Sequence, residues 1–137
     1  ISEAKVDGCL VIIPHPYHKF RHAVGLANPD ALALADALEA YNSRYYTKRS
    51  NENAAKTART LGKPITAGSD AHECTFVGYG RNIIEADEKS AEGILAAIRA
   101  GRISAECIQT PPSVYTKESY HNVMRKIKRF LHIGRQK

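Results

Sequence analysis

Three side chains with metal-binding chemistry follow two short apolar segments of the chain. His15 comes soon after the apolar run at residues 9–13, and Asp70 and His72 follow the segment at residues 64–68. Imidazole nitrogen together with carboxylate oxygen suits zinc, manganese or iron. An extended backbone would point Asp70 and His72 to the same side. A lone D-x-H is common, however, and an Asp after a Gly-Ser turn often only hydrogen-bonds the backbone. Spacing alone therefore leaves the metal site open.

The segments that carry these residues predict an α/β fold with parallel strands. Residues 9–13 show no polar alternation, which indicates a strand buried on both faces, with Cys9 as a small buried hydrophobe. Residues 64–68 predict another strand. Because the loops at the C-terminal ends of parallel strands meet at one edge, we expect the three candidate ligands to lie close together.

Helices alternate with these strands. A helix is expected from about residue 28, and residues 38–42 form either its continuation or a second strand. Ser50 is a good N-cap for a helix over residues 51–61, whose alanine-rich face suits close packing on a sheet. Gly62 is placed to end that helix. Residues 80–86 predict a further strand.

The last third of the chain predicts two more helices. Ser90 caps the first and Gly101 closes it. From residue 103 the pattern fades, and Pro111-Pro112 marks a boundary. Beyond it, one apolar stripe recurs at spacings of three and four, and basic residues fill the other face. The stripe consists of Tyr120, Val123, Met124, Ile127, Phe130 and Leu131. We therefore expect a body, residues 1–112, and a basic amphipathic helical tail, residues 113–137.

The positive charge of the chain belongs to this tail. The 137 residues carry a formal charge of +6, and residues 117–137 hold seven Lys or Arg and one Glu. The body is thus neutral and shows no general affinity for polyanions. Three readings of the tail stay open: its apolar stripe packs on the body, its basic face binds nucleic acid phosphates, or it lies on a membrane surface. The last is the weakest, since the chain contains no Trp.

Composition excludes several classes of protein. The longest apolar run is five residues, whereas a bilayer span needs roughly 20, so we expect no membrane protein. No secretory signal is visible. Three widely spaced cysteines without a C-x-x-C argue against a disulfide framework or a zinc finger, and reduced thiols favour a cytoplasmic location.

Four phrases of the chain resemble, in order and spacing, the PHP (polymerase and histidinol phosphatase) family of metal-dependent phosphoesterases. The first is IIPHPY at residues 12–17, and the second is LEAYNSR at residues 38–44. The third is the helix-to-strand stretch at residues 53–68, and the fourth is GSDAH at residues 68–72, with Val-Gly shortly after. The resemblance covers residues 8 to about 105. It favours a strand rather than a continued helix at residues 38–42.

The resemblance implies a distorted seven-stranded β/α barrel with two or three divalent metals (Zn, Mn or Fe) at the strand C-terminal ends. His15 matches the histidine ligand of the family's H-P phrase, and Asp70 and His72 match its D-x-H ligands. The implied reaction is hydrolysis of a phosphate ester by metal-activated water. The substrate would be a phosphorylated metabolite, a nucleotide or a nucleic acid end.

The substrate phosphate also needs cationic partners. Arg21 and Arg44 are candidates because a guanidinium matches that planar, charged group, with solvent exposure as the alternative for both. His18 is a further candidate for facing the phosphate. Glu39 and Asn42 are expected to shape the strand end rather than to bind metal.

One departure from the family limits these expectations. PHP proteins open with an H-x-H strand, an S-D-G phrase and further His and Glu ligands, whereas only seven residues precede Gly8 here. The chain therefore resembles the C-terminal half of a PHP domain plus a tail, and its start at Ile1 suggests a processed or truncated piece. Three ligands suit one weakly held ion, so we expect activity in the intact protein and little or none in these residues alone.

Two competing functions stay open. The first is a degenerate, non-catalytic module whose basic tail binds nucleic acid or a protein partner. The second is an amidohydrolase-like hydrolase on a related barrel, although the YNSR phrase at residues 41–44 favours the PHP family. An open half-barrel would leave sheet edges and apolar surface uncovered, which favours pairing of two copies.

Overall fold

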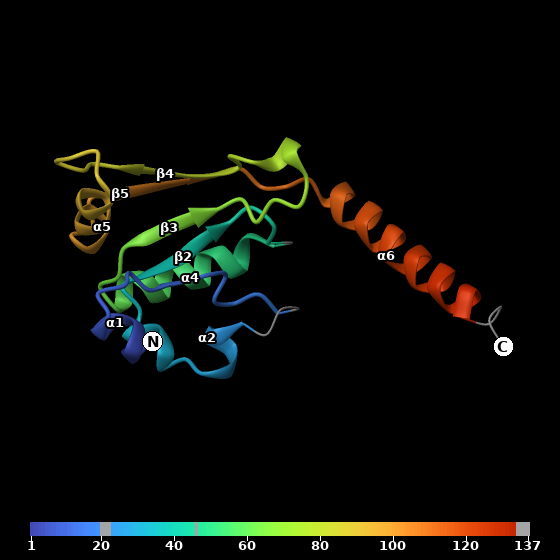
Figure 1. Cartoon of the computed structure of the whole chain (residues 1–137), viewed down its shortest axis with the longest axis horizontal. Helices are drawn as coiled ribbons and strands as arrows, with labels where there is room; N and C mark the ends of the chain where they lie inside the picture. Colours follow the sequence, from blue (N-terminus) through green and yellow to red (C-terminus); the bar gives the residue numbers. More distant parts are fainter. Residues whose placement is uncertain (20–22, 46, 134–137) are drawn as a thin grey trace.

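A three-stranded parallel sheet forms the centre of the molecule (Figure 1). The computed structural model describes residues 1–19, 23–45 and 47–133. The strand order is β1-β2-β3. The sheet consists of β1 (Ile12–Ile13), β2 (Ala37–Asn42) and β3 (Ile65–Gly68). The expected strands at residues 38–42 and 64–68 are therefore confirmed.

A second, two-stranded sheet packs against β3. It pairs β4 (Gly80–Ile84) with β5 (Ile103–Cys107), and α5 (Ala91–Arg99) connects the two strands. This pair is antiparallel, so the expectation of parallel strands is wrong here. The mixed α/β class is confirmed, but the sheets of the described residues do not form a closed barrel.

Strand β5 was not predicted from the sequence. Ile103, Ala105 and Cys107 are half-buried, whereas Ser104 and Glu106 between them are exposed. This strict alternation is the period of a strand with one covered face. The pattern was present in the sequence but is only five residues long.

One helix covers one face of the parallel sheet (Figure 1). This helix, α4 (Lys48–Thr60), buries Ala54, Ala55 and Ala58 against the sheet. Alanine lets helix and sheet backbones approach closely, as the alanine-rich face predicted. The shorter helical segments are α1 (Ser2–Val6), α2 (Val24–Ala27), α3 (Ala31–Leu34) and the 3₁₀ turn η1 (Cys74–Phe76).

The C-terminal end of α4 agrees with the prediction from the sequence, whereas its N-terminal end does not. The helix ends as predicted: Gly62 has a φ of +61°, its N–H donates to Arg59 O at 3.1 Å, and Lys63 N–H donates to Ala58 O at 2.8 Å. This pair of bonds is the glycine C-terminal motif. Ser50 is not the N-cap. Thr47 occupies that position in an extended conformation, because the good helix formers after it start the helix earlier.

The core lies between α4 and the central strand β2. Leu38 packs with Ile13, Leu32 and Ala58, and Ala40 packs with the other alanines of α4. The predicted burial of residues 9–13 on both faces is wrong, since Cys9 is exposed and Ile12 is 37% exposed. The physical reason is position: within the described residues β1 has only β2 as a neighbour and is two residues long.

A side chain joins the two sheets. Asn82 on β4 accepts from Ala67 N–H at 2.8 Å and donates to Ala67 O at 2.9 Å. Its amide thus satisfies the backbone groups of β3 in the way a neighbouring strand would. Gly80 makes this approach possible, because a Cβ there would lie 2.6 Å from Ser69 N and still closer to Gly68.

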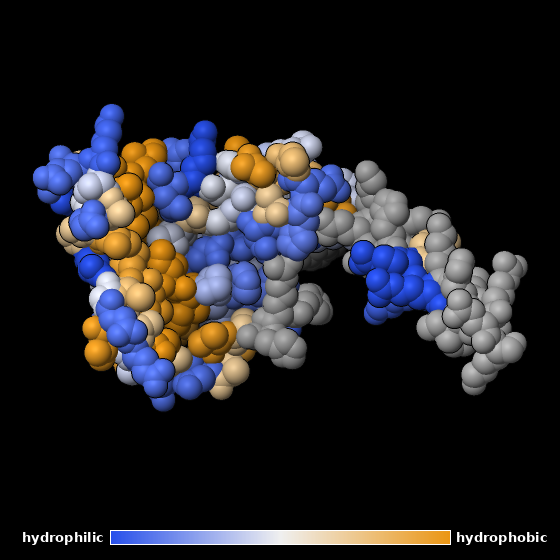
Figure 2. Space-filling model, viewed as in Figure 1, coloured by the Kyte–Doolittle hydropathy of each residue, from blue (hydrophilic) through white to orange (hydrophobic). Residues whose placement is uncertain are grey.

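Apolar side chains remain uncovered on the face that Figure 2 shows. They gather near α5 and the beginning of β3, as the same view in Figure 1 locates them. Ile12, Ile83 and Ile94 are among the exposed large apolar residues, at 37%, 53% and 40%. Such exposure on a sheet and its neighbouring helix is unusual for an isolated domain.

The last helix, α6 (Pro112–Ile133), extends away from both sheets (Figure 1). Val123 and Ile127 of the predicted apolar stripe are 54% and 46% exposed. Packing of the stripe on the body is therefore wrong for these two residues, because the helix leaves the body at its first turn. Within the described residues, no helix has both the length and the apolar character needed to cross a membrane.

Candidate strand-end site

The C-terminal ends of β1 and β3 bring two of the predicted ligands to one edge of the sheet. His15 follows β1 and Asp70 follows β3, on either side of the central strand β2. The carboxylate of Glu39 on β2 lies near both: its Oε2 accepts from His15 N–H at 3.0 Å, and its pKa responds to Asp70. The parallel topology thus brings His15 and Asp70 to the same edge of the sheet, whereas the convergence of all three predicted ligands stays a prediction.

Glu39 is a buried carboxyl, only 8% exposed. Burial raises its pKa above the usual value, and the negative charge of Asp70 acts in the same direction. The hydrogen bonds from His15 N–H and from the Asn42 amide, together with the charge of His15, oppose this rise. The carboxyl group thus accepts from specific donors of the protein.

A β-bulge places Asn42 beside Glu39. Along a regular strand, residues three apart point to opposite faces. Here Glu39 pairs with Thr66 and Tyr41 with Ala67, so Ala40 is an extra residue in β2. Asn42 consequently donates from Nδ2 to Glu39 Oε1 at 3.0 Å. These bonds agree with the expected role of both side chains in shaping the strand end.

The backbone is left-handed at both predicted ligands at this edge. His15 has a φ of +30° and Asp70 a φ of +48°, and these are the two non-glycine residues with positive φ among those described. Such conformations are costly for L-residues and concentrate at functional sites. Asp70 is therefore not extended, and the condition under which Asp70 and His72 would point to the same side is not met.

His72 lies beside Asp70 in spite of this turn. Its Nδ1 is 2.8 Å from Asp70 O and 4.0 Å from Asp70 Oδ1. Because a carbonyl oxygen only accepts, Nδ1 carries the hydrogen and Nε2 of the neutral ring keeps its lone pair. A backbone carbonyl on one ring nitrogen is a common arrangement for metal-binding histidines. The side chain is 50% exposed.

His15 offers a ring nitrogen without a partner. Its Nδ1 is buried and has no hydrogen bond to any described residue. Burying a polar atom without a hydrogen-bond partner costs free energy unless a bound group supplies the missing partner. An imidazole nitrogen of His15, the Asp70 carboxylate and Nε2 of His72 are donors of the kind that divalent metal ions bind. Within the described residues, no three His, Cys, Asp or Glu side chains converge on one point, so this ligand set stays a prediction.

Aromatic rings hold the loop after β1. His18 stacks on Tyr45 with ring centroids 5.3 Å apart and meets the His15 ring edge-on at 5.9 Å. The Tyr45 hydroxyl accepts from Tyr17 N–H at 3.1 Å. Burial raises the pKa of Tyr45, and the negative charge of Glu39 adds to the rise, so this hydroxyl stays protonated. The predicted phosphate contact of His18 is not tested by these contacts.

The two candidate arginines differ. Arg44 is 6% exposed, so the alternative of solvent exposure is wrong for it. Its Cζ lies 5.2 Å from the centre of the Tyr115 ring, at the first turn of α6. Arg21 lies outside the described residues, and its predicted role stays a prediction.

Cys107 belongs to the same neighbourhood, although the sequence analysis assigned it no role. Burial raises the pKa of its thiol, and the Glu39 carboxylate raises it further. Cys107 is the last residue of β5. The alternating pattern of β5 was the sequence signal that would have placed Cys107 at the end of a strand.

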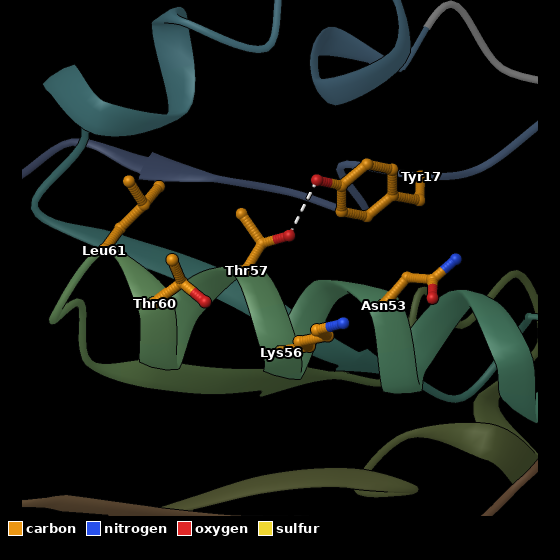
Figure 3. Close-up of a pocket in the computed structure, with 6 residues that line it drawn as sticks. All are labelled: Tyr17, Asn53, Lys56, Thr57, Thr60 and Leu61. Atoms are coloured by element: carbon orange, nitrogen blue, oxygen red, sulfur yellow. Dashed lines mark hydrogen bonds between the residues drawn. The ribbon is translucent and has the colours of Figure 1, made fainter.

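A groove lies beside the site, on α4. It has a volume of about 430 Å³, and the Tyr17 hydroxyl lies 2.8 Å from Thr57 Oγ1 in it (Figure 3). Its walls are Tyr17, Asn53, Lys56, Thr57, Thr60 and Leu61. None of the predicted metal ligands lines it.

Comparison with known proteins supports the resemblance. The family model PHP_C, described as PHP-associated, matches residues 48–103, from the start of α4 to the start of β5. The match is consistent with the C-terminal portion of a PHP family protein, and the predicted relationship to this family is confirmed. No curated protein matches the chain.

Proposed function

We propose that the chain contributes to a metal-dependent phosphoesterase of the PHP type. The observation that supports this function best is the buried, unpartnered Nδ1 of His15 at the edge where Asp70 also lies. His15, Asp70 and His72 would hold the metal. A divalent ion bound there supplies Lewis acidity toward a phosphate ester and lowers the pKa of water.

The residues around these ligands have supporting roles in this proposal. Glu39 and Asn42 orient the loop that carries His15, and the ring of His18 lies beside it. Arg21 is proposed to neutralise the substrate phosphate. Arg44 is also a proposed phosphate partner, and its stacking on Tyr115 would fix its direction. The substrate class is a phosphorylated metabolite, a nucleotide or a nucleic acid end.

The fold proposal is that β1, β2 and β3 belong to a distorted seven-stranded barrel with α4 outside. The parallel order, the uncovered apolar side chains and the single neighbour of β1 within the described residues support it. In that barrel, two or three metals would need ligands beyond these three, so we propose weak activity for the 137 residues alone. Pairing of two copies would also cover the open face, and light scattering in solution tests it.

Metal content tests the proposed function directly. The chain and its His72→Ala variant, purified identically, are compared by elemental analysis. We expect more zinc, manganese or iron in the parent than in His72→Ala, whereas Glu73→Ala, an exposed neighbour, keeps the parent's content. Hydrolysis of phosphate esters by the intact protein is then measured. Equal metal in parent and His72→Ala, or none in either, contradicts the proposal.

A second candidate function is binding of nucleic acid through α6. The observation that favours it is the exposure of Arg125, Lys126 and Arg129 on a helix that extends from the body. Their replacement together by Gln is expected to weaken binding of a 20-base-pair duplex and to flatten its salt dependence. Fluorescence anisotropy between about 50 and 200 mM salt measures both. If the parent does not bind the duplex, this function is contradicted. The apolar side of α6 is then expected to bind a protein partner.

The proposed compartment is the cytoplasm. All three cysteines are free, and Cys9 and Cys74 are exposed. Exposed unpaired thiols persist in a reducing compartment.

A further inference from the structure

Glu39 makes two contacts that the proposed ligand set does not require. Its Oε2 accepts from the backbone N–H of His15 at 3.0 Å, and its Oε1 accepts from Asn42 Nδ2 at 3.0 Å. The carboxylate is 8% exposed. Burying a charged group is costly unless donors satisfy it, so a carboxylate inside the buried central strand calls for a purpose.

Three features of the chain build the space for this carboxylate. The bulge at Ala40 turns Asn42 to the side of Glu39. Gly68 leaves room on β3, because a Cβ there would overlap Glu39 Oε1 and lie 2.8 Å from its Cδ. The third feature is the loop after β1, which aims the His15 N–H at Oε2. Each comes from a different strand of the parallel sheet or from the loop that follows it.

The contact with His15 acts on a strained residue. A φ of +30° is rarely adopted by L-residues and costs about 1 kcal/mol or more. A hydrogen bond to an ionised carboxylate is stronger than one between neutral groups. The bond to Glu39 is therefore placed to hold the His15 backbone in this conformation. That backbone in turn sets the direction of the imidazole.

We infer that Glu39 is a positioning residue for His15, and that Asn42 orients Glu39 for this role. The inference rests on the proposed function, in which His15 binds metal. In this role Glu39 acts through the His15 backbone, because its Oε2 accepts from His15 N–H while its Oε1 accepts from Asn42 Nδ2. The chain of contacts runs from Asn42 Nδ2 through the carboxylate to His15 N–H.

A pair of variants separates hydrogen bonding from charge. Glu39→Gln replaces two acceptors by one acceptor and one donor, so one of the two bonds is lost. Adding Asn42→Asp restores both: the new glutamine accepts from His15 N–H and donates to the new aspartate. The second oxygen of that aspartate still accepts from Arg44 N–H, as Asn42 Oδ1 does at 2.8 Å. The negative charge has then moved from position 39 to position 42.

The first measurement uses the metal-free protein. Amide hydrogen exchange at His15, followed by NMR, reports the bond to Glu39 without any metal. We expect exchange at least 10-fold faster in Glu39→Gln and restored protection in the double variant. Glu106→Gln, an exposed carboxyl on β5, is the control and leaves His15 unchanged. Unchanged protection in Glu39→Gln, or no recovery in the folded double variant, overturns the inference.

The second measurement is calorimetric titration with Mn²⁺ alone. We expect affinity to fall roughly 10- to 100-fold in Glu39→Gln, as for other residues that orient metal ligands, and to recover in the double variant. If the Mn²⁺ affinity falls in Glu39→Gln and does not recover in the double variant, Glu39 acts through its negative charge or as a metal ligand. That result contradicts a positioning role. If the parent binds no Mn²⁺ while His15 exchange responds as expected, the proposed function fails and the positioning contact stands. Should Glu39→Gln not fold by circular dichroism, Asn42→Ala replaces it, with faster His15 exchange expected.

Discussion

At the scale of single residues, unusual features concentrate at one strand-end edge. A buried carboxylate, two left-handed residues and an unpartnered imidazole nitrogen occur at Glu39, His15 and Asp70. None of them stabilises the fold by itself, because buried charge and backbone strain both oppose folding. Their presence together is expected of a site that is held ready for a ligand.

The first prediction concerns Gly68. In Gly68→Ala the new methyl group would occupy the position of Glu39 Oε1, so the carboxylate must move away from His15. We expect a stability loss of about 1–3 kcal/mol, as for other overpacking substitutions, and weaker Mn²⁺ binding by calorimetry.

A matched glycine controls for backbone effects. Gly62→Ala introduces strain at a φ of +61° where no atom lies within 4 Å of the new Cβ. It should cost stability, measured by urea unfolding, without changing Mn²⁺ affinity. Equal loss of affinity in both variants would show that general destabilisation, not displacement of Glu39, is responsible.

The second prediction concerns Asp36, which ties α1 and β1 together. Its carboxylate accepts from Val11 N–H at 2.8 Å and lies 2.9 Å from Lys5 Nζ. Burial alone would raise its pKa. The Val11 N–H and the Lys5 ammonium, with a contribution from Arg99, outweigh burial and hold the pKa below its usual value.

The sign of the pH effect follows from this shift. The unfolded chain binds the Asp36 proton at a higher pH than the folded chain does, so its stabilisation is present above about pH 4 and is lost as the pH falls further. In Asp36→Asn we expect lower stability at pH 6 and a smaller decline below pH 4, by urea unfolding. Glu52→Gln, on the exposed side of α4, is the surface control. A decline as steep as that of the parent would contradict this assignment.

At the scale of elements, side chains make hydrogen bonds that regular pairing of the strands does not supply. The bulge in β2 is an interruption of regular pairing that produces the Asn42–Glu39 contact. Asn82 completes the pairing of β3 on its other side. The bulge in β2 and the Asn82 side chain each link a strand of the parallel sheet to the site. Neither contact needs an additional strand.

The third prediction follows from the Asn82 contact. Asn82→Ala leaves the N–H and C=O of Ala67 without these partners, and Ala67 is only 7% exposed. A buried backbone group without a partner costs roughly 1–3 kcal/mol, so we expect a loss of about 2–3 kcal/mol in chemical unfolding. Arg81→Ala, which removes the exposed ion pair with Glu106, should cost less than about 1 kcal/mol. Similar losses in the two variants would contradict the strand-like role of Asn82.

At the scale of the whole molecule, the body and α6 are distinct. Helix α6 extends from the sheets, and near its first turn the Tyr115 ring lies under Arg44 of the body. The excess positive charge lies on residues 117–137, whereas the rest of the chain is neutral. The buried core and the net positive charge therefore lie in different parts of the chain.

The fourth prediction separates these parts. Ending the chain after Thr116 keeps Tyr115 and removes the charged turns. We expect the free energy of unfolding to change by less than about 0.5 kcal/mol, since surface changes away from buried features are usually this small. Chemical unfolding measures it, and duplex binding in the same sample tests the second candidate function. A loss of several kcal/mol would show that α6 packs on the body after all.

Local features were readable from the sequence because short-range rules decide them. The end of α4 at Gly62 needs one residue that tolerates a positive φ, and the start of α5 needs the Ser90 oxygen, which accepts from Gly93 N–H at 3.0 Å. Neither depends on distant residues. The strand at residues 38–42 was equally compatible with a helix, and the resemblance to the PHP family decided it correctly.

Only the tertiary structure decided the features that depend on which distant segments meet. The antiparallel pairing of β4 with β5, the bulge at Ala40 and the burial of Arg44 against Tyr115 all arise from contacts between separate elements. The sequence determined that His and Asp side chains, which are of types that can bind metal, follow the ends of two strands. The fold decided that Glu39 lies between them, because a third, central strand had to bring its carboxylate to the same edge.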